Sequence, residues 1–256
     1  LVQAGISTAR LGALVLLEDV TGIDRAKLLA EPDQPSSPAQ EAKLKKLLAS
    51  RAQHVPLAYV RGWTEFYGRK FVITPAVLEP RPESETMIDL LKSLADLPAE
   101  PCVADVGTGS GALGITAKLE LPKARVELLE IDEKAVEVAK INVDLLTTGL
   151  ATIQSDLLSE TDTDFDVLLC NLPYVPDGYH INTSALHEPK IAIFGGLDGL
   201  DLYRKLFKQV QERATRPLYI LSEALPPQHP ALATIALTEG YQLQQTDDFI
   251  QVFRRS

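Results

Sequence analysis

The chain has 256 residues, 45% of them hydrophobic, and a formal net charge of −10 at pH 7. This length predicts one large domain with a smaller one, and no apolar run approaches the roughly 20 residues that a membrane-spanning helix needs. Acidic residues outnumber basic ones by 35 to 25, which argues against DNA or RNA as the main partner, because nucleic-acid-binding surfaces are usually basic.

The first part of the chain predicts a small helical domain over residues 1–56. Leucine and isoleucine recur there at the spacing of amphipathic helices. Ser37, Pro38 and Gln40 form a helix-start pattern, in which the serine caps the helix and the glutamine completes a capping box.

Residues 57–78 have a different pattern. Aromatic and β-branched residues alternate there with polar ones, and Gly62 and Gly68 interrupt the run. This pattern predicts a β-hairpin that links the helical domain to the rest of the chain.

Strand and helix patterns alternate over residues 79–256, which predicts an α/β, Rossmann-like domain with a mostly parallel sheet covered by helices on both faces. The last two strands follow each other without a helix, so we expect the final strand to be antiparallel. The expected strands are 102–106, 125–131, 151–155, 165–170, 217–222, 241–246 and 249–255, and the expected helices are 81–91, 111–121, 133–146, 198–213 and 228–239. Because ligands bind at the carboxyl ends of such strands, functional residues should follow the strands directly.

A glycine-rich turn, DVGTGSG over residues 105–111, follows the first of these strands and precedes a helix. Gly107, Gly109 and Gly111 allow a tight turn and a close approach of the backbone to a ligand. The glycines also match the G-x-G-x-x-G pattern of dinucleotide-binding proteins. Asp105 favours a different cofactor, because its carboxylate suits a cationic amino-acid group better than a pyrophosphate.

Two acidic residues lie at the ends of the next two strands. Glu130 ends the second strand, where a carboxylate can accept hydrogen bonds from both hydroxyls of a ribose. Asp156 follows the third strand and could meet the edge of an adenine, although a plain turn residue is an equal alternative.

The sequence Asn-Leu-Pro-Tyr begins at Asn171, directly after the fourth strand. An asparagine side chain offers one acceptor and two donors, which complement an amide or a ring amino group. Pro173 fixes the turn and cannot donate a hydrogen bond, and Tyr174 offers a flat face to a planar group. Together they predict a binding site for an NH2 group attached to an sp² carbon. Such a nitrogen is a poor nucleophile, so its reaction would depend on being held in position.

These motifs, in this order, resemble the S-adenosylmethionine-dependent amino-methyltransferases of the Asn-Pro-Pro-Tyr type. Within that group, residues 56–85 and 188–206 are similar to the flanking segments of the release factor glutamine methyltransferases. The resemblance implies methylation of the side-chain amide nitrogen of the glutamine in the Gly-Gly-Gln loop of peptide chain release factors. It also implies a class I methyltransferase sheet preceded by a helical domain and a β-hairpin.

The same resemblance implies a role for each matching residue. The implied catalytic and substrate-binding residues are Asn171, Leu172, Pro173 and Tyr174. The implied binding residues for S-adenosylmethionine are Asp105, Gly107, Thr108, Gly109, Ser110, Gly111, Glu130, Asp156, Leu157 and Asn171.

Three features depart from the family pattern. Leu172 replaces the usual first proline, so the turn is less fixed although the backbone carbonyl remains. Glu130 replaces the usual aspartate, and residues 221–236 match only loosely. The Asn-Leu-Pro-Tyr sequence is shared with rRNA adenine dimethyltransferases, but those enzymes are basic and lack the 56–85 segment.

Other functions remain alternatives at this point. The methyl acceptor could be a glutamine of a ribosomal protein or an adenine amino group, and the glycines could belong to a nicotinamide-dependent dehydrogenase. A non-catalytic binding module with this fold is a further alternative.

We expect a monomer that acts on a release factor in the cytoplasm and binds neither nucleic acid stably nor membranes. We expect no metal site and no disulfide framework, because Cys102 and Cys170 form no Cys-x-x-Cys pair and the four histidines lack ligand spacing.

Overall fold

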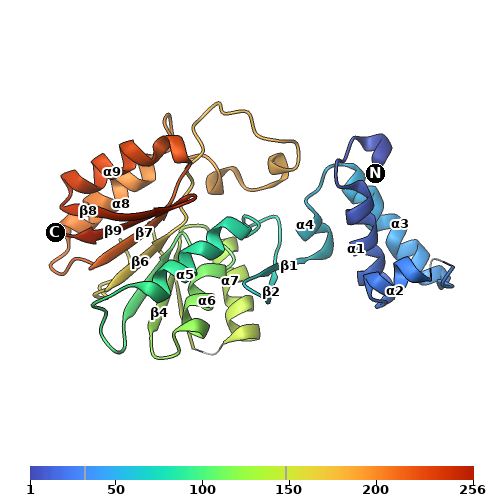
Figure 1. Cartoon of the computed structure of the whole chain (residues 1–256), viewed down its shortest axis with the longest axis horizontal. Helices are drawn as coiled ribbons and strands as arrows, with labels where there is room; N and C mark the ends of the chain where they lie inside the picture. The colour runs from blue at the N-terminus through green and yellow to red at the C-terminus, as the bar shows by residue number, and fades with distance from the viewer. Residues whose placement is uncertain (32, 148) are drawn as a thin grey trace. The chain divides into compact units, whose positions relative to one another are not determined.

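The computed structural model describes residues 1–31, 33–147 and 149–256 (Figure 1). Residue 32, which falls in the predicted helical domain, and residue 148 lie outside these ranges. The chain divides into two compact units, one of Leu1–Thr64 with Ile181–His187, and the other of Glu65–His180 with Glu188–Ser256. No helix of the described residues is long and apolar enough to cross a membrane.

The first unit is helical, as the sequence predicts. It contains the short 3₁₀ turn η1 (Val2–Ala4) and the helices α1 (Ala9–Thr21), α2 (Arg25–Ala30), α3 (Pro38–Ala52) and α4 (Leu57–Arg61). The predicted capping box of α3 is confirmed, since Gln40 donates its backbone N–H to Ser37 and Ser37 donates its own to the Gln40 side chain.

One prediction for this region is wrong: residues 57–61 form the helix α4 and not a strand of the hairpin. Gly62 ends this helix with a φ of 79°, and its N–H donates to the Ala58 carbonyl. The Arg61 guanidinium bonds to both carboxylate oxygens of Asp19 and lies 3.6 Å from the ring centroid of Trp63. These contacts hold α4 against α1, and they depend on residues too far apart in sequence for a local pattern to reveal.

The hairpin itself is shorter than predicted and consists of β1 (Trp63–Phe66) and β2 (Arg69–Val72). Its turn residues, Tyr67 and Gly68, both have positive φ, at 50° and 68°. Such turns match the right-handed twist of paired strands.

Within the described residues, seven strands of the second unit form one sheet in the order β5-β4-β3-β6-β7-β9-β8 (Figure 1). Neighbouring strands are parallel except for β9, which is antiparallel to both β7 and β8. The predicted fold class is therefore confirmed. The strands are β3 (Cys102–Val106), β4 (Arg125–Glu130), β5 (Ala151–Gln154), β6 (Val167–Cys170), β7 (Tyr219–Glu223), β8 (Tyr241–Asp247) and β9 (Ile250–Arg255).

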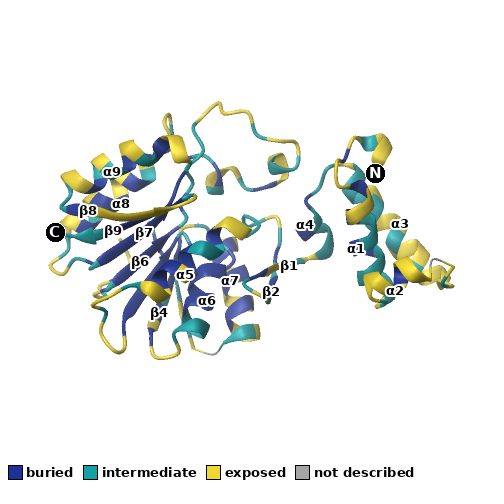
Figure 2. Cartoon of the chain, in the orientation of Figure 1, coloured by how far each residue is buried: buried dark blue, intermediate teal, exposed yellow. Residues whose placement is uncertain are grey.

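Helices cover both faces of this sheet, and the central strands are buried between them (Figures 1 and 2). The helices are α5 (Glu85–Ser93), α6 (Ala112–Glu120), α7 (Glu133–Leu146), α8 (Asp201–Glu212) and α9 (His229–Thr238). Short 3₁₀ turns occur at Pro82–Ser84, Ala185–His187, Lys190–Ala192 and Pro226–Gln228.

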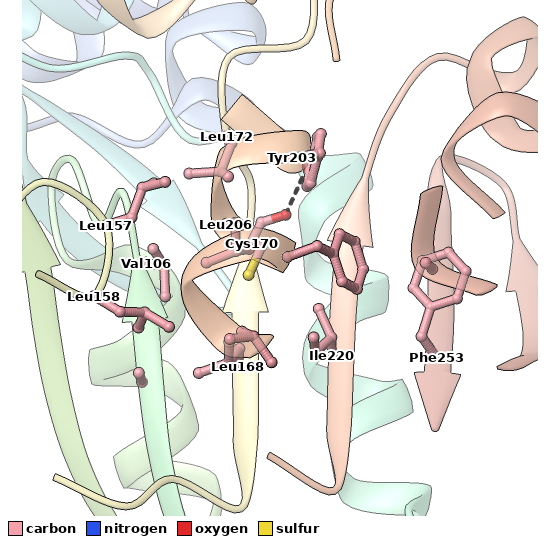
Figure 3. Packing of buried hydrophobic residues seen from close by; sticks show 14 of the residues in the cluster. Val106, Leu157, Leu158, Leu168, Cys170, Leu172, Tyr203, Leu206, Ile220 and Phe253 are labelled. Atoms are coloured by element: carbon pink, nitrogen blue, oxygen red, sulfur yellow. Dashed lines mark hydrogen bonds between the residues drawn. The ribbon is translucent and has the colours of Figure 1, made fainter. Parts of the chain in front are cut away.

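The core on the α8 face also fixes the strand ends (Figure 3). Leu206 of α8 packs there with Leu168 of β6 and Ile220 of β7. The Tyr203 hydroxyl lies 3.0 Å from the Cys170 carbonyl oxygen and 2.5 Å from that of Glu223. One tyrosine of α8 therefore ties the carboxyl ends of β6 and β7 together.

A buried asparagine connects the hairpin with the glycine turn. Asn142 of α7 is fully buried, donates to the Val72 and Ser110 carbonyls at 3.0 and 2.9 Å, and accepts the Val72 N–H at 2.7 Å. We expect Asn142→Ala to lower the free energy of unfolding by about 2–4 kcal/mol, because it leaves one buried and two partly buried backbone groups without this partner. Chemical denaturation measures this loss. The exposed neighbour substitution Glu137→Ala should cost less than about 0.5 kcal/mol, and equal effects of the two would contradict this role.

Candidate functional site

A pocket opens at the carboxyl ends of the parallel strands. It is bordered by the glycine turn after β3, by the segments after β4 and β5, and by the start of the loop after β6. The predicted site residues in its lining are Asp105, Gly107, Thr108, Gly109, Ser110, Glu130, Asp156, Leu157, Asn171, Leu172 and Pro173. The other two, Gly111 and Tyr174, lie next to this lining in the chain.

The turn after β3 has the backbone conformation that its glycines predict. Gly107, Gly109 and Gly111 have φ values of 73°, 54° and 84°, a region that residues with a side chain rarely adopt. The N–H groups of Gly107 and Thr108 both donate to the Leu129 carbonyl, at 2.8 and 3.0 Å. The turn is thus attached to the end of β4, and its glycines present no side chains to a ligand.

Asp105 is buried beneath this turn and has an unused acceptor. Its Oδ2 accepts hydrogen bonds from the Thr108 hydroxyl and the Gly114 N–H, whereas the buried Oδ1 has no partner among the described residues. Burial raises the pKa of Asp105 to about 6, although these two hydrogen bonds oppose the shift. A buried carboxylate with a free oxygen in a pocket lining favours a cationic ligand group.

Glu130 supports the same turn. One carboxylate oxygen accepts the Gly109 N–H at 2.8 Å, and the other accepts the N–H groups of Ile131 and Asp132 at 2.9 and 3.0 Å. Burial raises its pKa, and the backbone donors oppose this shift. Because a carboxylate has about four acceptor positions, Glu130 retains capacity for a ligand hydroxyl.

The segment after β5 adds Asp156 and Leu157 to the lining. The Asp156 carboxylate forms an ion pair with Lys205 of α8, which also lines the pocket. Leu157 has a φ of 56°, an uncommon value for a branched side chain, and it is buried in the core. This part of the pocket therefore combines an apolar surface with a charged edge.

Asn171 lies at the carboxyl end of β6, and its side-chain N–H donates to the Ser84 hydroxyl at 2.9 Å. The side chain of Leu172, the residue that departs from the family pattern, points into the core (Figure 3) and is only 2% exposed. The Tyr174 hydroxyl donates to Glu223 at 3.0 Å. That the ring of Tyr174 covers the planar group of the substrate stays a prediction.

Comparison with known proteins identifies the family. The PrmC N-terminal domain model matches residues 1–62, and the methyltransferase small domain model matches residues 84–188. The release factor glutamine methyltransferase of Koribacter versatilis is 36% identical over 82% of this chain and 76% of its own length. The chain belongs to the release factor glutamine methyltransferase family.

Another release factor glutamine methyltransferase, from Deinococcus radiodurans, is 30% identical over 97% of this chain and 90% of its own length. A solved methyltransferase structure from Pyrococcus furiosus has a TM-score of 0.56 and 17% identity, and the match covers 85% of this chain and 98% of that one. That structural match supports the class I methyltransferase fold.

As a member of the release factor glutamine methyltransferase family, the protein uses S-adenosylmethionine as methyl donor. The pocket fits this cofactor. The unpaired Oδ1 of Asp105 suits its ammonium group, and a side chain at Gly107 would lie 2.9 Å from Leu172 and crowd the pocket wall.

Several residues that line the pocket were not predicted from the sequence. They come from the segment after the hairpin and from the 3₁₀ turn Lys190–Ala192, and they are Ala76, Val77, Leu78, Pro80, Ser84, Ile191 and Ala192. The signal that could have identified them is their position inside the segments 56–85 and 188–206, which resemble the family. The residue patterns of individual β-strands do not identify these pocket residues.

Proposed function

We propose that this methyltransferase transfers a methyl group to the side-chain amide nitrogen of the glutamine in the Gly-Gly-Gln loop of a peptide chain release factor. The observation that carries the proposal is the position of Asn171 and Leu172 in the lining of one pocket with the glycine turn. The names of the relatives support the choice of a release factor as substrate.

The proposed cofactor contacts follow the chain from strand to strand. Asp105 accepts from the ammonium group, the backbone of Gly107–Gly111 surrounds the amino-acid part, and Glu130 accepts from the ribose hydroxyls. Asp156 and Leu157 lie at the adenine. When bound, S-adenosylmethionine supplies an electrophilic methyl group on a sulfonium.

Asn171 and Leu172 would position the methyl acceptor. An amide nitrogen is a weak nucleophile because its lone pair is delocalised into the carbonyl. Acceptance of its two hydrogens by Asn171 Oδ1 and the Leu172 carbonyl would hold the nitrogen in the attacking orientation, which can contribute several kcal/mol to the rate. Pro173 and Tyr174 would complete the glutamine pocket, and the amide proton can leave after transfer.

The remaining parts of the proposal concern partners and organisation. The helical domain, including α4 (Leu57–Arg61), would help to dock the release factor, and residues 79–256 would carry the chemistry. We propose a monomer that acts in the cytoplasm, where release factors function, and that forms no stable complex with nucleic acid, in keeping with its net charge of −10.

Incubation with a purified release factor and S-adenosylmethionine, followed by peptide mass spectrometry, tests this function. The expected result is a gain of one methyl group on the glutamine of the Gly-Gly-Gln peptide. A release factor with that glutamine replaced by leucine should gain none. Methylation of a ribosomal protein or of an adenine, with none on any release factor, would overturn the substrate assignment while leaving the chemistry intact.

Asp105 provides a prediction on cofactor binding. We expect Asp105→Asn to weaken S-adenosylmethionine binding by about tenfold or more, because a charge-assisted hydrogen bond becomes a neutral one. In the unsubstituted protein the ionised carboxylate binds the cation, so affinity should be full above the Asp105 pKa of about 6 and fall as the pH drops through it. Calorimetric titration at several pH values measures both effects. Asp144→Asn, which removes an exposed carboxylate of α7, is the control, and an unchanged affinity in Asp105→Asn would contradict the assignment.

A further inference from the structure

A chain of hydrogen bonds links Asn171 to Ser84, which also lines the pocket, and then to the buried Glu223. Asn171 donates its Nδ2–H to the Ser84 hydroxyl oxygen at 2.9 Å, and the Ser84 hydroxyl donates to Glu223 Oε2 at 2.6 Å. Ser84 and Glu223 are 2% and 1% exposed. They belong to the end of η2 (Pro82–Ser84) and the end of β7, and 139 positions separate them in sequence.

The number of available hydrogens determines the direction of this chain. An ionised carboxylate only accepts hydrogen bonds, and a serine hydroxyl has a single hydrogen to donate. Since that hydrogen of Ser84 goes to Glu223, the serine oxygen can only accept from Asn171. The NH2 end of the Asn171 amide must therefore face Ser84. Oδ1 accepts no hydrogen bond within the described residues, which leaves it available at the pocket.

We propose that Ser84 and Glu223 are positioning residues that fix the orientation of the Asn171 amide, so that Oδ1 and not Nδ2 faces the methyl acceptor. The proposal rests on the proposed function for the identity of that acceptor. It explains how an asparagine, whose two ends are nearly equal in shape, presents only its accepting end to the substrate. A flipped amide would direct N–H groups at the N–H groups of the glutamine.

The surroundings of Glu223 match this role. Its second oxygen accepts from the Tyr174 hydroxyl at 3.0 Å, and no cation forms an ion pair with it among the described residues. Burial and the nearby Glu83 raise its pKa, while hydrogen bonds from the Ser84 and Tyr174 hydroxyls and from the Asn171 side chain lower it. Burial raises the pKa of the neighbouring Tyr174, and the positive charge of Arg81 opposes this shift. Hydroxyl donors thus hold this carboxylate, and its protonation would reverse the direction of the chain.

Two substitutions test the positioning role, with kcat, KM for the release factor and the cofactor Kd as readouts. We expect Ser84→Ala and Glu223→Gln to lower kcat by about 10–100-fold. Each substitution removes or reverses a hydrogen bond that orients Asn171, which holds the methyl acceptor. KM and cofactor Kd should change less than about threefold, because Ser84 is only 2% exposed and its hydroxyl contributes little to the pocket surface. Ser84→Thr keeps the hydroxyl and should recover most of the lost kcat.

Ser222→Ala is the matched control, because Ser222 is an equally buried serine next to Glu223 whose hydroxyl has no partner. It should leave kcat unchanged. A pH profile adds a readout that a merely structural role would not change: the acidic limb of kcat in the unsubstituted enzyme should be absent in Glu223→Gln. Wild-type kcat in both Ser84→Ala and Glu223→Gln would overturn the inference.

A spectroscopic measurement separates this inference from the proposed function. The side-chain NH2 signal of Asn171 in the full-length, ¹⁵N-labelled protein should exchange slowly with solvent, and faster in Ser84→Ala. If the unsubstituted enzyme methylates no release factor but shows this difference, the proposed function fails and the positioning role holds. Equal exchange in both proteins would overturn the positioning role, whatever the substrate. If Glu223→Gln does not fold, the kinetic test compares Ser84→Ala with the conservative Ser84→Thr.

Discussion

Replacement of Asn171 by alanine is expected to lower kcat/KM for methyl transfer by at least about a hundredfold, since a displaced or missing positioning group commonly has an effect of this size. The reason is that Asn171 is the proposed acceptor for an amide hydrogen of the glutamine and cannot be replaced by water in the same geometry. Transfer of a labelled methyl group to a purified release factor measures the loss.

The control for this substitution is cofactor binding and folding. Asn171→Ala should bind S-adenosylhomocysteine within about tenfold of the unsubstituted protein, because the proposed contacts of Asp105 and Glu130 are separate from it. The variant should also retain a cooperative thermal transition. The account would be contradicted by an alanine variant that transfers methyl groups at an undiminished rate.

The second large effect is expected at Gly199. A side-chain carbon at this position would lie 2.0 Å from the Tyr174 carbonyl oxygen and 2.4 Å from Gln228 Nε2, and the residue has a φ of 79°. Gly199→Ala should therefore lower the free energy of unfolding by about 3 kcal/mol or more, from backbone strain of about 1–2 kcal/mol and overpacking of similar size. Any relaxation would move the backbone of residues 173–175, so methyl transfer should fall as well.

Gly178 offers a matched control, because it has the same φ of 79° but nothing within 4 Å of an added side-chain carbon. Gly178→Ala should thus show the backbone strain alone, about 1–2 kcal/mol. Chemical denaturation of both variants separates the two contributions. Similar losses at Gly178 and Gly199 would show that the close packing around Tyr174 has no energetic effect.

Local sequence patterns were sufficient to predict the sheet and the ligand-binding end of it. The glycines at 107, 109 and 111 required a turn with positive φ, and alternating strand and helix patterns required the carboxyl ends of the strands to meet. Asp105 and Glu130 lie at the carboxyl ends of β3 and β4, Asn171 follows β6, and all three line one pocket. Their convergence follows from sheet topology, which the alternation already implies.

Local patterns could not reveal the contacts between distant segments. Ser84 and Glu223 have no motif of their own, and their hydrogen bond exists only because η2 and the end of β7 meet in the folded chain. The helix α4 was missed for a similar reason, since its tie to α1 through Arg61 and Asp19 connects residues 42 positions apart. Tyr59 and Val60 have high strand propensity, but tertiary contacts outweigh this preference and both residues lie in a helix.

Leu172 illustrates a departure whose effect only the structure explains. Its side chain is 2% exposed and packs in the core next to Gly107, so the core accommodates leucine at this position. The backbone carbonyl, which is the part that the proposed mechanism uses, is the same in leucine and in proline.

The most direct test of the account is a crystal structure of the enzyme with S-adenosylhomocysteine and a release factor or its Gly-Gly-Gln peptide. We predict that the glutamine amide nitrogen lies within hydrogen-bond distance, about 3 Å, of both Asn171 Oδ1 and the Leu172 carbonyl oxygen, facing the sulfur of the cofactor product. A glutamine bound outside the pocket, or an Asn171 amide turned with Nδ2 toward the substrate, would contradict it.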